Sequence, residues 1–168
     1  MSDTPTPATA VEYVEVSAVP TVVVRARDYP MDQMPALFDS TFSAMFPALA
    51  QRGIAPAGPP FSLHHRIPDA TADLEVGIPL TEPLSEPITV GEVELTASEL
   101  PAGTVARTSY RGGYEGLGDA WGGFMGAIVA AGRAPNFPFW EVYVTEPRPD
   151  MDPATLQTDL VTLVSPAS

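Results

Sequence analysis

Apolar and polar residues alternate over several short stretches of this chain, which is the period-two pattern of half-buried strands. The alternation is clearest in residues 73–80, where one face would carry Leu74, Val76, Ile78 and Leu80. Other β-branched or alternating stretches predict strands at residues 11–16, 21–27, 61–67, 90–99, 103–110, 139–145 and 156–164. Proline-rich residues 79–87 indicate a linker between two halves.

A longer stretch repeats apolar residues every three or four positions, which predicts an amphipathic helix from about Met34 to Arg52. Asp32 is its expected N-terminal cap, and Gly53 its expected C-terminal stop. Pro47 lies inside this segment and cannot donate a backbone hydrogen bond. We therefore expect a kink or a break at Pro47.

A second helix is predicted by a stripe of Leu117, Trp121, Phe124 and Ile128, and Gly132 should end it. Five glycines lie in or beside this segment: Gly116, Gly118, Gly122, Gly123 and Gly126. Each interior glycine costs about 1 kcal/mol relative to alanine. Close packing of the helix on a sheet would explain them. Room for a ligand beneath the helix, or a mobile first turn, is the alternative.

A short motif occurs twice at an offset of 79 residues: Gly53, Ala55, Pro56 and Pro59 recur as Gly132, Ala134, Pro135 and Pro138. Each copy follows a predicted helix and leads into a predicted strand. The copies differ where Ser62 in the first corresponds to Glu141 in the second. The duplication predicts two similar strand–helix–strand–strand halves, about residues 11–82 and 90–165, in an α+β fold with a cleft at their junction.

Composition and charge exclude several classes of binding partner and of catalytic chemistry. The chain has 21 acidic residues, 8 arginines and no lysine, for a net charge of −13. Nucleic acid is not an expected partner, because phosphate binding needs a basic surface; cationic ligands are favoured. With no cysteine, disulfides, thiol catalysis and zinc–thiolate sites are excluded. Residues 1–10 read as a disordered tail, and the lack of a long apolar run leaves a cytoplasmic protein without a membrane span as the expectation.

The predicted strand at residues 139–145 holds the best candidate for chemistry. Alternation places Phe139, Glu141 and Tyr143 on one face, and Trp140 on the other. A carboxylate between aromatic rings is costly to bury unless it is paired, neutralised or open to a cavity. The structural alternative is a hydrogen bond to a neighbouring strand or to an arginine such as Arg107. His64 and His65 would face opposite ways, so they suit one metal poorly, although one of them could line a pocket.

Several segments together resemble the GyrI-like small-molecule-binding domains, which also occur as effector-binding domains of AraC-type regulators. The segments are residues 73–80 (DLEVGIPL), 100–103 (LPAG), 110–117 (YRGGYEGL) continuing into Ala120-Trp121, 140–143 (WEVY) and 158–160 (TDL). The resemblance spans about residues 11–165. It departs from the commoner pattern where Gly112-Gly113 replaces Gly-Pro, and where Asp159 replaces a glutamate.

The resemblance implies a single domain over residues 11–168, without a helix-turn-helix segment. Its duplicated halves would form a curved antiparallel sheet with two helices and a ligand groove between the halves. It implies a pocket glutamate at Glu141 and a hydrophobic aromatic, often cationic, small molecule as ligand. The expected lining is Glu141, Tyr143, Phe139, Trp140, Tyr110, Tyr114, Trp121 and His64. No cofactor or metal is expected, and no protein partner is indicated.

Some stand-alone relatives in this family are hydrolases that open strained cyclopropane rings. By that resemblance Glu141 would assist an attacking water, and Tyr143, Tyr110 or Tyr114 would polarise a carbonyl. A third class comprises relatives that bind a topoisomerase, but no segment of this chain specifically supports that role.

Overall fold

The computed structural model describes residues 11–113, 116–145 and 156–165. The expected tail at residues 1–10 and the side chain of Tyr114 lie outside these ranges. The chain divides into two compact units. The N-terminal unit comprises Ser17–Ala102, and the C-terminal unit combines Met1–Val16 with Gly103–Ser168. In the described part of the chain, nine strands pair in antiparallel fashion with two α-helices beside them, which confirms the α+β class.

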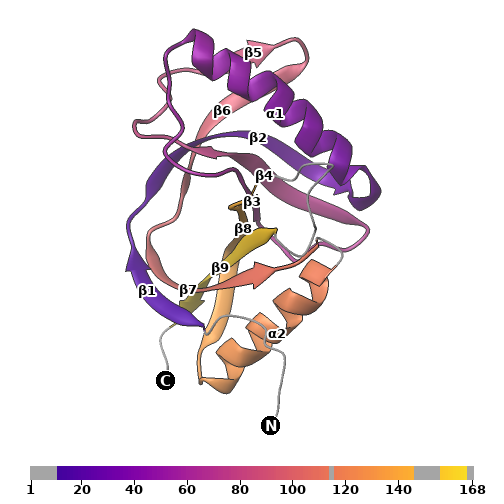
Figure 1. The fold of residues 1–168 in the computed structure, drawn as a ribbon, viewed down its shortest axis with the longest axis vertical. Helices are drawn as coiled ribbons and strands as arrows, with labels where there is room; N and C mark the ends of the chain where they lie inside the picture. Colours follow the sequence, from indigo (N-terminus) through magenta and orange to yellow (C-terminus); the bar gives the residue numbers. More distant parts are fainter. Residues whose placement is uncertain (1–10, 114–115, 146–155, 166–168) are drawn as a thin grey trace. The chain divides into compact units, whose positions relative to one another are not determined.

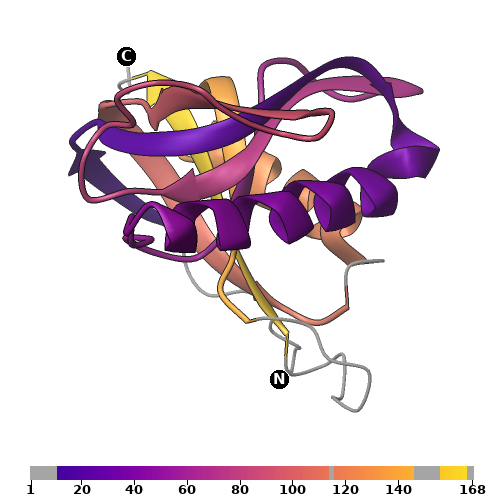
Figure 2. The same ribbon diagram turned by 90° about the horizontal axis from the view of Figure 1, so that it is seen from above.

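The N-terminal unit is a five-stranded sheet with one long helix along one face (Figures 1 and 2). Its strand order is β3-β4-β2-β6-β5. The elements are β2 (Val19–Pro30), a 3-10 turn (Met31–Gln33), α1 (Met34–Gln51), β3 (Phe61–His64), β4 (Thr71–Pro79), β5 (Ile88–Val90) and β6 (Val93–Leu100).

The bounds of α1 agree with the apolar periodicity, but two details differ. The N-cap residue is Gln33 and makes no side-chain capping bond, so Asp32 is not the cap. The helix also continues through Pro47 without a break. Ala48 and Leu49, which follow the proline, are buried in the core, and their packing offsets the lost hydrogen bond.

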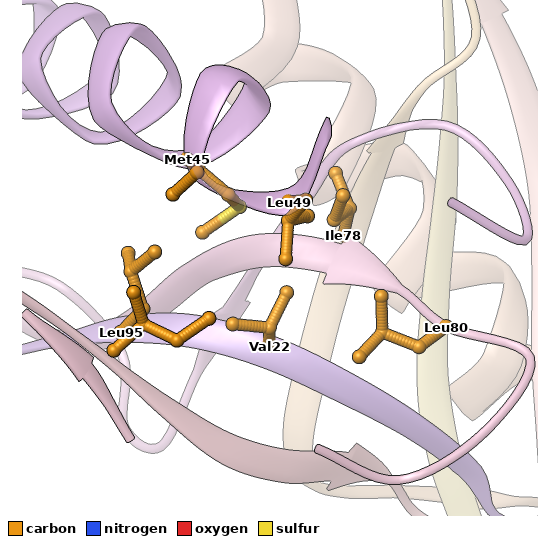
Figure 3. Packing of buried hydrophobic residues seen from close by; sticks show 8 residues of the cluster. Val22, Met45, Leu49, Ile78, Leu80 and Leu95 are labelled. Carbon is orange, nitrogen blue, oxygen red and sulfur yellow. The ribbon is translucent and has the colours of Figure 1, made fainter. Parts of the chain in front are cut away.

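The core of the N-terminal unit lies between α1 and the sheet (Figure 3). Met45 and Leu49 of the helix pack against Val22, Ile78 and Leu95 of three different strands. A neighbouring cluster includes Leu37, Ala72, Leu74 and Val76. The expected apolar face of residues 73–80 is therefore the face that α1 covers.

The C-terminal unit repeats this plan with strand order β1-β7-β9-β8. Its helix packs Phe124 and Ile128 against Ala106, Leu160 and Val164 of the sheet. The elements are β1 (Glu12–Val16), β7 (Gly103–Arg111), α2 (Leu117–Ala130), β8 (Ala134–Tyr143) and β9 (Gln157–Ser165). No helix in the described ranges is both long and apolar enough to cross a membrane.

The duplication is visible in the way both helices end. Gly53 and Gly132 have φ angles of 69° and 85°, the left-handed conformation that glycine adopts most easily. The residue after each glycine donates its backbone N–H back across the turn, Ile54 to Leu49 O and Arg133 to Ile128 O. Both ends are Schellman motifs. The repeated sequence motif thus encodes a repeated helix stop.

Strand register extends the correspondence. Ser62 pairs with Val76, which pairs with Val24 on the next strand. Glu141 pairs in the same way with Leu160, which pairs with Thr108. Residues directly opposite each other share a face. Ser62 and Glu141 therefore hold equivalent positions on the helix-covered face of their sheets, as the sequence offset predicts.

The glycines of α2 do not reflect close packing. A Cβ atom added at Gly118, Gly122, Gly123 or Gly126 would meet no atom within 4 Å, and all four residues are exposed. The close-packing interpretation is therefore wrong for these four, because they face away from the sheet. Gly116 differs, since a Cβ there would lie 2.2 Å from the hydroxyl oxygen of Tyr110.

Candidate functional site

The β8 strand carries the candidate site on the face that α2 covers. Beyond a bulge between Asn136 and Phe139, β8 pairs regularly with β9. Glu141 lies opposite Leu160, which packs against α2, so the Glu141 side chain lies on the helix side. Phe139 and Tyr143 share that face because side chains alternate along a strand.

Both carboxylate oxygens of Glu141 accept a hydrogen bond from an aromatic side chain. The indole N–H of Trp121 donates to Oε2 at 2.6 Å, and the hydroxyl of Tyr143 donates to Oε1 at 2.7 Å. The alternative of a bond to Arg107 is wrong. Arg107 pairs with Val161 on the opposite face of the sheet, and its Nε donates to Glu12 at 2.9 Å.

Burial raises the pKa of Glu141 above its usual range, because the ionised carboxylate has lost much of its hydration. The hydrogen bonds from Tyr143 and Trp121 oppose this rise in pKa, since they stabilise the charged form. The side chain is only partly buried by accessible surface. Glu141 is thus a desolvated acid that solutes can still approach.

Aromatic rings surround this carboxylate. The ring of Trp121 lies 4.8 Å from that of Phe139 and 5.5 Å from that of Phe124, both in tilted arrangements. Phe137 extends the group at 5.8 Å from Phe139 and is half exposed. The result is an aromatic wall from α2 and β8 beside the Glu141 carboxylate, a combination suited to flat or cationic molecules.

Tyr110 lies on the same face, two strands from β8, but its hydroxyl is engaged elsewhere. It pairs with Thr158, which in turn pairs with Tyr143. The Tyr110 hydroxyl donates to the carbonyl of Gly113 at 2.8 Å. Gly112 and Gly116 leave space for this ring, since a Cβ at either would lie within 2.7 Å of the hydroxyl. The glycines of residues 112–116 therefore hold Tyr110 in place.

Two of the expected ligand residues lie away from Glu141. Trp140 is buried on the opposite face of β8, across from Val161. His64 belongs to the N-terminal unit and faces α1, because it pairs with the core residue Leu74. Burial, assisted by the nearby charge of His65, lowers the pKa of His64 to about 4, so it is neutral at physiological pH. The structure thus brings together Glu141, Tyr143, Phe139 and Trp121.

Sequence reasoning missed Thr158 in this neighbourhood. Its side chain is fully buried, and among the described residues its hydroxyl has no hydrogen-bond partner. The available signal was a polar residue on a strand face that also carries Leu160, Thr162 and Val164. Thr158 lies directly opposite Tyr143 in the pairing of β8 with β9.

Chemically, the arrangement offers an anionic oxygen pair held by two donors beside aromatic rings. It can pair with a cation, or it can accept a proton from a water molecule that attacks an electrophile. The four residues of this arrangement all belong to the C-terminal unit: Trp121, Phe139, Glu141 and Tyr143.

Comparison with solved structures identifies the fold. The C-terminal domain of EcmrR matches with a TM-score of 0.70 at 16% identity, over 93% of this chain and 97% of that one. This chain spans 57% of the EcmrR chain in its DNA complex. A hydrolase from Listeria innocua matches with a TM-score of 0.64 at 14% identity, covering 95% and 94% of the two chains.

SAV2435 bound to tetraphenylphosphonium also matches, with a TM-score of 0.55 at 11% identity over 94% of each chain. No protein-family model and no curated protein sequence matches this chain. At these identities the likeness concerns the fold.

Proposed function

Because this chain has the fold of the GyrI-like effector-binding domains, we propose that it binds a hydrophobic aromatic cation at Glu141. The observation that carries this proposal is the desolvated carboxylate of Glu141 against the rings of Trp121, Phe139 and Tyr143. Within the described ranges no arginine or histidine forms an ion pair with it. A bound cation would supply the missing positive charge.

The energetics support a cation over a neutral compound. An ion pair and a cation–π contact contribute roughly 1–2 kcal/mol each when water is excluded. The net charge of −13 adds a weak long-range attraction. SAV2435, which has the same fold, has a solved structure bound to the aromatic cation tetraphenylphosphonium.

The test is the affinity of tetraphenylphosphonium for wild-type protein and for Glu141→Gln, measured by isothermal titration calorimetry. The variant keeps the shape of the side chain and removes the charge, so we expect a loss of about ten- to a hundredfold. Asp119→Asn is the control, because it changes net charge on the exposed side of α2. Equal affinity of wild type and Glu141→Gln, or an equal loss in Asp119→Asn, would contradict the proposal.

The second candidate is a hydrolase that opens a strained cyclopropane conjugated to a carbonyl. The raised pKa of Glu141 favours it, because a general base works best when its pKa approaches the working pH. Glu141 would take a proton from water while the water oxygen bonds the ring carbon and the carbon–carbon bond at that carbon breaks in the same step. The electrons of the broken bond pass to the carbonyl, and the proton returns to the resulting enolate. The fold shared with the Listeria innocua hydrolase supports this candidate.

Mass spectrometry separates the two candidates. Incubation with a cyclopropane-containing alkylating compound should give the adduct of one water if the protein is a hydrolase. Glu141→Gln should then bind the compound but lose about a hundredfold or more of turnover. Binding without any hydrated product assigns the protein to binding alone.

A further inference from the structure

A recess of about 420 Å³ lies in the N-terminal unit, where two neighbouring strands separate. The pairing of β2 with β6 ends at Val23 and Thr96, yet β2 continues to Pro30 and β6 begins at Val93. Leu37, Ser40 and Thr41 of α1 line the recess. Figures 1 and 2 show this helix running along the sheet. All residues that line the recess belong to this unit, so it is distinct from the Glu141 site.

One of the α1 residues that line this recess carries a buried hydroxyl. Thr41 lines it and is 1% exposed, and its Oγ1 forms no hydrogen bond with any described residue. The neighbouring Ser40 shows the usual alternative, because its hydroxyl donates to the backbone carbonyl of Leu37 at 3.2 Å. A buried hydroxyl without a partner destabilises the fold. A solute that fills the recess and bonds Thr41 would remove this cost.

The charges around the recess favour a cation. Glu92 and Glu94 line it and are exposed. Arg25 also lines it, but its Nε lies 3.9 Å from Oε2 of the buried Glu75, which is not a lining residue. The positive charge of Arg25 is therefore shared with a carboxylate outside the recess. Two carboxylates remain to attract a positive group, while Val24 and Leu37 supply apolar surface.

We propose that this recess is a second small-molecule site, for a compound with one positive charge, a compact apolar body and a hydrogen-bonding group. The hydrogen-bonding group meets Thr41, the apolar body fills the space against Val24 and Leu37, and the charge lies beside Glu92 and Glu94. This site needs no residue of the Glu141 site, so its test is independent of the test of the proposed function.

The probe is 4-aminocyclohexanol, which is cationic at neutral pH, with 1,4-cyclohexanediol as its neutral counterpart. Neither has an aromatic ring, so neither suits the wall around Glu141. In an NMR titration of the labelled full chain, we expect saturable shifts of the amides of residues 40–41 and 93–96 with the amine. The diol should bind at least about threefold more weakly. Absence of saturation, or shifts only around Trp121, would overturn the proposal.

Two matched pairs of variants locate the contacts. Thr41→Val should weaken binding of the amine by about tenfold, whereas Thr21→Val should not. Thr21 is a suitable control because it is also fully buried with an unpartnered hydroxyl, but lies outside the recess.

Glu94→Gln should weaken binding of the amine, and Glu99→Gln, which lies on the same strand and is also exposed, should not. Unchanged affinity in both Thr41→Val and Glu94→Gln would refute the site. If Thr41→Val fails to fold, the comparison of Glu94→Gln with Glu99→Gln tests the site, and equal affinity in these two variants would refute it.

Discussion

Glu141 distinguishes two otherwise equivalent positions of the molecule. In the N-terminal unit the equivalent residue is Ser62, which is buried and carries no charge. In the C-terminal unit the same position carries a carboxylate whose burial raises its pKa. Desolvating a carboxylate costs stability that a serine would not cost. The cation that we propose as ligand would offset this cost by pairing with the carboxylate.

The pH dependence of cation binding should report this carboxylate. Tetraphenylphosphonium has a fixed charge, so only the protein titrates. Because the pKa of Glu141 is raised, the neutral acid forms at a higher pH than for an ordinary glutamate. Affinity should be constant above that pKa and should fall by up to about tenfold per pH unit below it. Calorimetric titrations over a pH series provide the measurement.

Glu141→Gln is the control for this pH series, since it retains every other titratable group. The difference in affinity between wild type and variant should shrink as the pH falls through the pKa of Glu141. Parallel pH profiles for the two proteins would show that another group governs binding.

The sequence predicted part of this site for a simple reason. Period-two alternation assigns Phe139, Glu141 and Tyr143 to one face without any knowledge of the fold. The bond from Trp121 to Glu141 joins a helix to a strand 20 residues away, so it depends on how α2 packs. Arg107 was a wrong partner because strand register, which the pattern does not reveal, places it on the opposite face.

Among the elements, helices and their stops were the most predictable. Gly53 and Gly132 indicate the C-terminal ends of α1 and α2, because few other residues adopt their backbone conformation. The bounds of strands that contain proline were harder to predict from the sequence. The β8 strand begins at Ala134, five residues before the predicted start, since Pro135 and Pro138 obscure its alternation. The three-residue β5 directly follows the proline-rich linker, and the single strand predicted at residues 90–99 is in fact β5 and β6, which a turn at Gly91 and Glu92 separates.

The glycines of α2 give a prediction for this element. Gly122 and Gly126 are exposed in the helix interior, and a methyl group at either meets open space. Alanine at each should raise the free energy of unfolding by roughly 0.5–1 kcal/mol, because it favours the helical backbone. Urea denaturation of the two single variants measures the change.

Gly116→Ala is the contrasting variant. Its methyl group would lie 2.2 Å from the Tyr110 hydroxyl, so this change should destabilise the protein by about 1–3 kcal/mol. Stabilisation by Gly116→Ala, or destabilisation by both outer alanines, would refute this assignment of the glycines.

At the scale of the whole chain, the two units are not simple consecutive halves. The first strand, β1, pairs with β7 of the C-terminal unit, and β6 pairs with β2 of the N-terminal unit. The sequence repeat revealed the strand–helix–strand–strand plan but could not reveal this pairing. The paired residues are roughly 75 to 95 positions apart in the sequence, and their pairing depends on tertiary structure, which periodicity does not encode.

Removal of β1 tests its place in the C-terminal unit. A chain starting at Ser17 loses the ion pair from Arg107 to Glu12 and the contact of Arg133 with the Tyr13 ring. It also exposes the edge of β7. We expect the melting temperature to fall by about 5–10 °C, which corresponds to roughly 2–3 kcal/mol. A chain starting at Val11 keeps β1 and is the control. Equal melting temperatures of the two truncated chains would contradict the assignment.

The most direct test of the central claim uses the two tryptophans, which lie on opposite sides of β8. The indole N–H of Trp121 donates to Glu141, whereas Trp140 is buried on the other face. In an NMR titration with tetraphenylphosphonium, the Trp121 indole signal should shift saturably and the Trp140 signal should move far less. Trp140→Phe assigns the signals. A saturable shift of Trp140 alone, or no shift of Trp121 while calorimetry shows binding, would contradict the account.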